Sequence, residues 1–589
     1  MNKKLFALLS VMVIASLAIA ACAPKATEAP ATEVMTEAPT EAATAAPTAE
    51  PTPIPDVPIA TFDGASLSVP AEECNGDYKG LIQSVVATDD HTVTFTLCRP
   101  DPAFLSKIAF SGYGIYPSEW IESTAGDGTR TSEGLEHPIG TGPYMVREWK
   151  RGESITFTAN PDYWGEPPAA QTLVFRWSTD SAARLLDLQA GTIDGFDNVG
   201  PDDFETIKAD PNLQLVTRPA LNVFYIGITN TAAPFDNIKV RQALAQGIDR
   251  QRIVDNFYPV GSEVASHFTP CSIPNGCVGD PWYDFNPEAA KALLAEAGYN
   301  ETNPFPKIKL YYRDVVRGYL PQVSNVAQDI QAQLKENLGI DAEIVVMESG
   351  AFIEASTSGS LTDGLYLLGW GADYPHITNF LDYHFGAANP QFGTQSDTYT
   401  SLLAEGAQIA DPAEAESIYI QSNNAIREYV PMIPIAHGGS AVAYRADVLN
   451  PQASPLSNEL FAFSDPGGRD TFVWMQNAEP ISLFCADESD GESLRACEQV
   501  NESLYAYEIN GSASVPALAE SCTPDADLKV WTCALRQGVK FHDGSDFDAK
   551  DVVATFNMGL NIGSPFHVGN TNLWEYYDYL WGLMKKPGG

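Results

Sequence analysis

The chain has 589 residues, too many for a single hydrophobic core, so about three or four domain-sized units are expected. Its hydrophobic content of 44% is that of a globular protein. The 34 basic residues are outnumbered by 76 acidic ones, which gives a net charge of −42. Such a surface repels phosphate backbones and anionic lipid, so we expect no nucleic-acid partner and no membrane contact through basic residues.

The N-terminus has the pattern of a secretory signal peptide. A short positive region (residues 2–4) precedes an apolar run from Leu5 to Ala21. The run ends in Ile19-Ala20-Ala21-Cys22, which resembles the lipobox of bacterial lipoproteins. By this resemblance residues 1–21 are removed and Cys22 carries the lipid. The alternative, a retained transmembrane helix, is less favoured because the run is short and ends in small residues.

Residues 22–58 are almost entirely Ala, Pro, Thr and Glu, a composition that cannot form a core. We expect an extended tether that reaches on the order of 100 Å, at about 3.1 Å per residue. The folded part would then lie outside the cell membrane, attached to its outer face through the lipid.

The remaining cysteines suit an oxidising compartment. They fall into four pairs that are close in sequence: Cys74 and Cys98, Cys271 and Cys277, Cys485 and Cys497, Cys522 and Cys533. Proximity alone predicts four short-loop disulfides, although other connectivities remain open. No C-x-x-C occurs, so a structural zinc site is disfavoured.

The first half of the globular region has the pattern of an α/β protein. Strands are predicted at 91–97, 144–149 and 173–177, a helix at 181–190 and a strand at 192–196. The G-x-G at 140–142 is not a dinucleotide loop, because Pro143 follows it and no third glycine or helix does. The order strand–helix–strand predicts the α/β class.

The pattern continues through the middle of the chain. Strands are predicted at 224–230, 308–311, 342–347, 432–435 and 441–444, and helices at 240–253, 286–298 and 327–338.

One short run, Gly369 to Pro375, carries the strongest indication of a ligand site. A buried strand (365–368) leads into it and is predicted to break at the two glycines that flank Trp370. An indole and the Asp373 carboxylate would then project where the sheet ends, which is where open α/β sheets bind ligands. A carboxylate beside aromatic walls suits a primary amine. The alternative is that Asp373 caps a helix beginning near His376 and that Trp370 is a core residue.

Several motifs together resemble those of the extracellular solute-binding proteins, family 5, of oligopeptide and dipeptide ABC importers. They occur in the family's order: PIGTGPY (138–144), ANPDYWG (159–165), LQAGTIDGF (188–196), APFDNIKVRQALAQGIDRQRIV (233–254) and GWGADYP (369–375). The resemblance implies a two-lobed, type II periplasmic-binding-protein fold in its large three-segment variant, with mixed sheets and a hinge. The implied organisation is a peripheral subdomain of lobe 1 (59–137 and 481–589), a core of lobe 1 (138–255 and 440–480) and lobe 2 (256–439).

The order of segments departs from the family at the C-terminus. Family members begin with a strand like Thr471–Trp474, a Glu-Pro turn like Glu479-Pro480 and later a helix like Ala549–Phe556, all of which come last here. The simplest interpretation is a circular permutation, with the usual termini joined at the Pro-Gly-Gly turn of 465–469. A truncated second copy is disfavoured because nothing in 59–469 duplicates the block. A domain-swapped dimer remains open, although we expect a monomer.

The resemblance also implies the residues of the site. Asp373 would accept the α-amino group of a peptide, Trp370 would form a wall, Gly369 would allow the backbone to approach the ligand, and Tyr374 belongs to the same motif. Four further positions match segments that hydrogen-bond peptide main chain: Thr229, Asn230, Asn477 and Glu479. Some peptide binders carry Arg where this chain has Leu367, so oligosaccharide, opine or metal-chelate ligands remain alternatives.

The implied activity is binding and delivery to an ABC-transporter permease, without turnover and without a cofactor. An extracellular hydrolase is less favoured, since G-x-S-x-G and H-E-x-x-H are both absent. His376, Asp382 and His384 could form a metal site, but capping and surface histidines are commoner, so no metal is expected.

Overall fold

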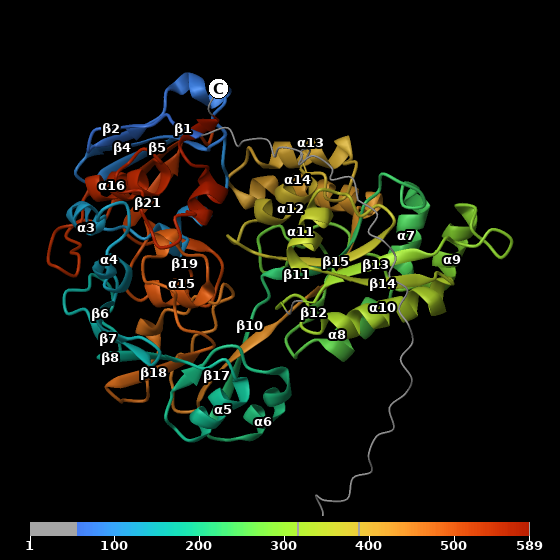
Figure 1. Ribbon diagram of the computed structural model, residues 1–589, viewed down its shortest axis with the longest axis horizontal. Coiled ribbons are helices and arrows are strands. Elements are labelled where there is room, and N and C mark those ends of the chain that lie inside the picture. Colours follow the sequence, from blue (N-terminus) through green and yellow to red (C-terminus); the bar gives the residue numbers. More distant parts are fainter. Residues whose placement is uncertain (1–55, 315–316, 387–388, 588–589) are drawn as a thin grey trace, which may run out of the picture. The chain divides into compact units, whose positions relative to one another are not determined.

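The computed structural model describes residues 56–314, 317–386 and 389–587, so Cys22 and nearly all of the predicted tether lie outside the described residues. Three main sheets organise the described chain (Figure 1). Two of them form the cores of lobes 1 and 2, and the third belongs to the peripheral subdomain. The α/β class with mixed sheets is confirmed.

Lobe 1 is built on a seven-stranded sheet in the order β10-β17-β9-β18-β8-β7-β6. In chain order its strands are β6 (Tyr144–Lys150), β7 (Ser154–Ala159), β8 (Thr172–Trp177), β9 (Gly195–Phe196), β10 (Leu213–Arg218), β17 (Ser440–Arg445) and β18 (Thr471–Gln476). The strand β18 comes from the C-terminal region yet lies centrally, parallel to both β8 and β9. The lobe 1 sheet therefore depends on a segment far away in sequence.

Both faces of this sheet are buried, and successive side chains along a strand point to opposite faces. On β17, Val442 and Tyr444 join the larger core, which includes Trp474. Ala441 and Ala443 face the opposite side, where α5 (Ser181–Gln189) and α6 (Phe204–Ala209) cover the sheet. A run of apolar residues without polar alternation is typical of such a doubly covered strand.

Lobe 2 contains a six-stranded mixed sheet in the order β12-β16-β11-β15-β13-β14. Its strands are β11 (Asn222–Ile228), β12 (Glu263–Val264), β13 (Ile308–Arg313), β14 (Ala342–Met347), β15 (Gly364–Gly371) and β16 (Met432–His437). Its helices are α7 (Ile238–Gly247), α8 (Arg250–Phe257), α9 (Pro287–Glu296), α10 (Val323–Leu338), α11 (Ser349–Thr357), α12 (Ile377–Phe385), α13 (Asp397–Gly406) and α14 (Pro412–Tyr429).

The chain passes from lobe 1 to lobe 2 near residue 220, and the prediction that it does so at residue 255 was wrong. Residues 222–255 were assigned to lobe 1, but β11 pairs with β15 and β16, and α7 and α8 pack in the lobe 2 core. The strand predicted at 432–435 also stays in lobe 2, and only β17 returns to lobe 1. Sequence pattern cannot assign a strand to a sheet, because pairing depends on residues more than a hundred positions apart.

Two short connections join the lobes, residues 219–221 and Gly438-Gly439. The Asn222 side chain crosses between them: its Nδ2 donates to Gly438 O at 2.7 Å, and its Oδ1 accepts from Gly438 N at 2.8 Å. His437 Nδ1 donates to Asn222 O at 2.6 Å. The two connections are thus held together at the lobe 2 end by side-chain hydrogen bonds.

The peripheral subdomain combines the two ends of the described chain. Its sheet has the order β2-β3-β4-β5-β22-β21, formed by β2 (Thr61–Phe62), β3 (Ser66–Ser68), β4 (Ile82–Asp89), β5 (Thr92–Leu97), β21 (Ala519–Pro524) and β22 (Val530–Leu535). Figure 1 shows the blue N-terminal strands beside red α16 (Ala549–Leu560). Both segments contribute to one hydrophobic core. The C-terminal block therefore completes this subdomain within its own chain.

The end of the predicted tether is ordered. Residues Asp56–Pro58 form β1, which pairs antiparallel with β23 (Lys585–Pro587). Lys585 Nζ lies 3.0 Å from Asp56 Oδ2. The tether was predicted to extend to residue 58, but the folded part begins at least three residues earlier because the chain end pairs with it.

Gly140 and Gly142 of the PIGTGPY motif lie so close to the backbone at Val500 that only glycine fits there. A Cβ at Gly140 would lie 2.1 Å from Val500 O, and one at Gly142 would lie 2.6 Å from the same atom. These distances leave no room for a side chain, so the motif serves the contact between lobe 1 and the C-terminal block.

A buried glutamate of the C-terminal block binds two of the motifs. Glu502 accepts from Thr141 Oγ1 at 2.8 Å, Tyr163 Oη at 2.9 Å and Trp164 Nε1 at 2.7 Å. Burial outweighs these hydrogen bonds and raises the pKa of Glu502 to about 7.

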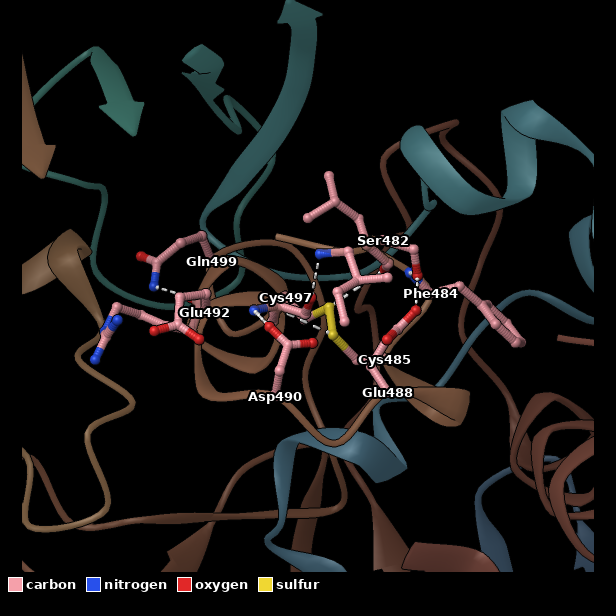
Figure 2. The surroundings of a disulfide bond; sticks show 12 residues. Ser482, Phe484, Cys485, Glu488, Asp490, Glu492, Cys497 and Gln499 are labelled. Atoms are coloured by element: carbon pink, nitrogen blue, oxygen red, sulfur yellow. Dashed lines mark hydrogen bonds between the residues drawn. A yellow bond between two sulfur atoms is a disulfide. The ribbon is translucent and has the colours of Figure 1, made fainter. Parts of the chain in front are cut away.

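All four cysteine pairs predicted from proximity are disulfide-bonded in the structure. Cys522 and Cys533 face each other across β21 and β22. Figure 2 shows Cys485 joined to Cys497 of α15 (Gly491–Cys497), beside Ser482 and Glu488, whose side chains are hydrogen-bonded. Each bond closes a short loop within one lobe or subdomain.

Among the described residues, no helix combines the length and the apolar character that a membrane span requires.

Candidate ligand site

The run from Gly369 to Gly371 ends strand β15 and does not interrupt it. The predicted break at Gly369 was wrong, because Gly369 pairs in register with Phe224 and the ladder continues to Gly371. A Cβ at Gly369 would lie 2.6 Å from Val223 O and 2.3 Å from the Tyr319 ring. Glycine is therefore required there by packing within lobe 2.

Asp373 is held by the side chain of Asn379, two residues into helix α12. Asn379 Nδ2 donates to Asp373 Oδ2 at 3.0 Å, and Asn379 Oδ1 accepts from Asp373 N at 3.1 Å. The same Oδ1 accepts from Trp370 Nε1 at 3.0 Å. One buried amide thus orients both the carboxylate and the indole that the sequence indicated.

The helix-capping alternative for Asp373 is excluded by the geometry. The N-cap of α12 is His376, whose Nδ1 accepts from Thr378 N at 3.3 Å. The Asp373 carboxylate binds a side-chain amide and no amide of the first turn. It is therefore available for another role.

Asp373 is a half-buried carboxylate without a cationic partner. Burial raises its pKa, which hydrogen bonds from Asn379 and Tyr579 partly offset. No Lys, Arg or His among the described residues forms an ion pair with it. Such a group gains most from a ligand that brings a positive charge.

Aromatic rings surround the carboxylate. Trp370 stacks on Tyr383 with ring centroids 4.4 Å apart, and Tyr383 lies edge-on to Tyr579 at 6.4 Å. Tyr579 belongs to the π-helical turn η7 (Tyr577–Trp581) of the C-terminal block. Groups from lobe 2 and from the peripheral subdomain thus meet at Asp373.

Two cavities lie between lobe 2 and the peripheral subdomain, the first lined in part by Tyr374 and the second by residues 375–377. The first, of about 430 Å³, is lined by Arg99, Asp101, Lys107, Tyr374, Asn379, Asp382, Tyr383 and Tyr579, among others. The second, of about 650 Å³, is more apolar and is lined by segments that include 272–275, 375–377 and 508–514. Both fall in the size range of small-molecule sites.

The structure separates Thr229 and Asn230 from this site. Strand β11 runs antiparallel to β15, so Asn222 lies opposite Gly371 and Ile228 lies opposite Leu365. Both residues follow β11 at the end remote from Asp373, roughly 20 Å away at about 3.3 Å per residue. Asn230 is buried and bonds the backbone of Thr394 at 2.9 and 2.8 Å. That these two residues contact the same ligand as Asp373 stays a prediction, and it requires a ligand long enough to span this distance.

Asn477 and Glu479 lie on lobe 1, where protein groups already bind them. Asn477 Oδ1 accepts from Asn198 Nδ2 at 3.0 Å. Glu479 accepts from Trp149 Nε1 at 3.0 Å and from Gly152 N at 3.1 Å. Their predicted part in ligand binding stays a prediction.

Comparison with known proteins identifies the family. The profile described as bacterial extracellular solute-binding proteins, family 5, middle part, matches residues 45–392 and 513–573. The chain belongs to this family.

The curated relatives of this family-5 protein carry names for two kinds of ligand. It is 31% identical to heme-binding protein A of Haemophilus influenzae over 65% of this chain and 69% of the relative. It is 30% identical to di/tripeptide-binding protein 1 of Pseudomonas aeruginosa, over 64% and 70%, and 29% identical to the dipeptide-binding protein of Escherichia coli, over 65% and 71%.

Solved structures of family members show the same fold. HbpA2 of Haemophilus parasuis matches with a TM-score of 0.58 at 32% identity, covering 63% of this chain and 72% of that one. The dipeptide-binding protein of Pseudoalteromonas in complex with Met-Leu matches with a TM-score of 0.50 at 26% identity, covering 66% and 76%. The two-lobed type II fold is thereby confirmed.

The candidate site of this family-5 protein includes three residues that the sequence did not indicate: Asn379, Tyr383 and Tyr579. Asn379 lies six positions after Asp373, a spacing that brings them together only because a turn precedes α12. Tyr579 had no sequence signal, since its approach depends on how the C-terminal block packs.

The two histidines near the site are structural in this arrangement. His376 caps α12, and His384 is fully buried among aromatic rings with Nδ1 donating to Phe380 O at 2.8 Å. Burial lowers the pKa of His376 to about 4 and that of His384 to about 3. No cluster of metal-ligating residues occurs among the described residues.

Proposed function

We propose that this chain binds a di- or oligopeptide between its lobes and that Asp373 accepts the peptide's α-ammonium group. The observation that carries the proposal is a half-buried carboxylate that has no cationic partner within residues 56–314, 317–386 and 389–587 and is oriented by Asn379, with Trp370 and Tyr579 beside it. The peptide names of several relatives support the same ligand class.

The remaining parts of the proposal concern delivery. Peptide would pass from the closed cleft to an ABC-transporter permease, and the protein would be a monomer held at the outer face of the membrane by a lipid on Cys22. Cys22 lies outside the described residues, so its lipobox-like sequence is the support.

We also propose that the unit is circularly permuted. In its support, β18 is a central strand of lobe 1, β22 pairs with β5, and β1 pairs with β23. Each of these pairings joins a strand after residue 470 to a strand earlier in the chain. This is expected if the segments of the family's fold occur here in a changed order.

The proposal is tested by calorimetry of the purified chain with Ala-Ala and with N-acetyl-Ala-Ala. Ala-Ala should bind, and acetylation, which removes the ammonium charge, should abolish measurable binding. The variant Asp373→Ala should weaken Ala-Ala by about thirty-fold or more, because truncating one partner of a buried charge pair costs about 2–5 kcal/mol.

Glu405→Gln is a matched control, since Glu405 is an exposed acid on the neighbouring helix α13. It should bind Ala-Ala as the unchanged chain does. Equal affinity for the free and the acetylated peptide would refute the role of Asp373. Recovery of intact Ala-Ala after incubation distinguishes a binding protein from a hydrolase.

A further inference from the structure

A second carboxylate lies one helical turn beyond the group that holds Asp373. Asp382 follows Asn379 by three residues on α12, so both side chains emerge on one face of the helix, about 4.5 Å apart along its axis. Both residues line the first cavity, together with Tyr383 and Tyr579. Asp373 does not itself line this cavity, but Asn379 and Tyr579, whose side chains hydrogen-bond to Asp373, do. The cavity therefore extends from these two neighbours of Asp373 to Asp382.

Asp382 is unsatisfied in this cavity. Its Oδ1 is buried and has no hydrogen-bond partner, and the carboxylate forms no ion pair with any residue that the structure describes. Burial, followed by the charge of Asp101, raises its pKa to about 7, whereas Lys107 lowers it. A buried carboxylate left without a partner is costly, and a bound cation would remove that cost.

The positive groups of the cavity do not neutralise Asp382. Lys107 Nζ lies 2.7 Å from Asp101 Oδ2, with both side chains largely buried, so this pair is balanced internally. Lys107 also lies 5.2 Å from the centre of the Tyr374 ring. Arg99 is exposed, and its Nη1 donates to Lys79 O and Gly80 O at 3.4 and 3.3 Å. Of the two carboxylates that line this cavity, Asp101 and Asp382, only Asp101 is paired with a cation among the described residues.

We propose that the first cavity recognises a cationic side chain through Asp382, so that the preferred ligand is a peptide whose first residue is Lys or Arg. The α-ammonium group binds at Asp373, and the side chain extends past Tyr383 to Asp382. The faces of Tyr383 and Tyr579 suit both the methylene chain and the cation. This inference rests on the proposed peptide-binding function and adds the side-chain class.

The test compares lysyl-alanine with norleucyl-alanine, which has a similar side-chain length but no charge. Calorimetry on the purified chain should show lysyl-alanine binding at least about tenfold more tightly. Asp382→Asn should remove this preference by weakening lysyl-alanine about tenfold while leaving norleucyl-alanine unchanged or tighter. Asp382→Glu, which keeps the charge, should retain a preference, and Glu405→Gln should behave as the unchanged chain.

The outcomes separate this inference from the function on which it rests. If both dipeptides bind the unchanged chain equally, the cation site is refuted while peptide binding stands. If Asp382→Asn weakens both dipeptides alike, the effect is structural and the cation site is again refuted. If neither dipeptide binds, the proposed function fails and this inference fails with it.

Discussion

At the scale of single residues, Asn379 determines the geometry of the site. It is 1% exposed and uses both ends of its amide, accepting from the Trp370 indole and the Asp373 backbone and donating to the Asp373 carboxylate. Trp370 lies near the end of β15 and Asp373 lies two residues beyond its end, so secondary structure alone does not fix the Asp373 carboxylate. The carboxylate is thus presented by a side chain that need not touch the ligand.

Replacing this amide should weaken binding without abolishing the fold. Asn379→Ala leaves the Trp370 indole and the Asp373 amide unsatisfied, which costs about 1–3 kcal/mol of stability. We expect Ala-Ala to bind about tenfold more weakly, as measured by calorimetry, with a lower melting temperature. A folded variant with undiminished affinity would show that Asp373 does not need this support.

At the scale of elements, a ring of four buried charges joins β10, α15 and two loops of lobe 1. Arg218 contacts Asp197 at 2.7 Å and donates from Nε to Glu459 at 2.8 Å. Arg495 closes the ring, with 2.8 Å to Glu459 and 2.7 Å to Asp197. Although burial alone would raise it, the two guanidinium groups lower the pKa of Asp197 to about 2. The ring connects residues on both sides of the Pro-Gly-Gly turn.

Breaking the ring should destabilise lobe 1 strongly. Glu459→Gln leaves two buried guanidinium groups short of a charge partner, so we expect a loss of about 3–5 kcal/mol in the free energy of unfolding. Urea titration measures it. Glu343→Gln, which breaks the exposed pair with Lys307, serves as control and should change stability by at most about 1 kcal/mol. A similar small effect of both variants would contradict the structural role of the ring.

At the scale of the whole molecule, burial moves the pKa values of many groups in opposite directions. Three glutamates of the C-terminal block are raised, to about 7 for Glu488, about 8 for Glu498 and about 7 for Glu502. The pKa values of two histidines are lowered to about 4: His437, beside the connection between the lobes, and His542, in the C-terminal block. Desolvation is the largest cause in every case.

These shifts predict that stability falls between pH 6.5 and 8.5. At pH 6.5 the two histidines are neutral in the folded chain but about half-charged in the unfolded chain, so their titration up to about pH 7.5 adds about 0.4 kcal/mol of stability each, less than the opposing effect of the glutamates. The raised glutamates still bind protons in the folded chain up to about pH 8, whereas in the unfolded chain they are already ionised above about pH 4.3. The folded state therefore holds more protons, and raising the pH favours unfolding.

The expected loss is on the order of 2 kcal/mol, seen as a lower melting temperature at pH 8.5 than at pH 6.5. Glu498→Gln should make this dependence shallower, since it removes the most strongly shifted group. A melting temperature that is unchanged or higher at pH 8.5 would contradict the assignment of these buried acids.

Local features of the chain were predictable because they depend on neighbours in sequence. The strands at 92–97, 172–177 and 342–347, the helix at 287–296 and the four short disulfide loops all follow from periodicity, capping residues or proximity. The family motifs also predicted the two-lobed fold. Asp373 and Trp370 could be singled out because one short segment carries both.

Only the tertiary structure decided which segments meet. It placed β11 in lobe 2, with Thr229 and Asn230 at the end of the strand remote from Asp373, and it brought Tyr579 of the C-terminal block to Asp373. It also showed that Asp382 Oδ1 is buried without a hydrogen-bond partner in the part of the chain that the structure describes, which no local pattern can reveal. The physical reason is that sheet pairing and burial depend on contacts between distant residues, whereas helix and strand formation depends mainly on adjacent ones.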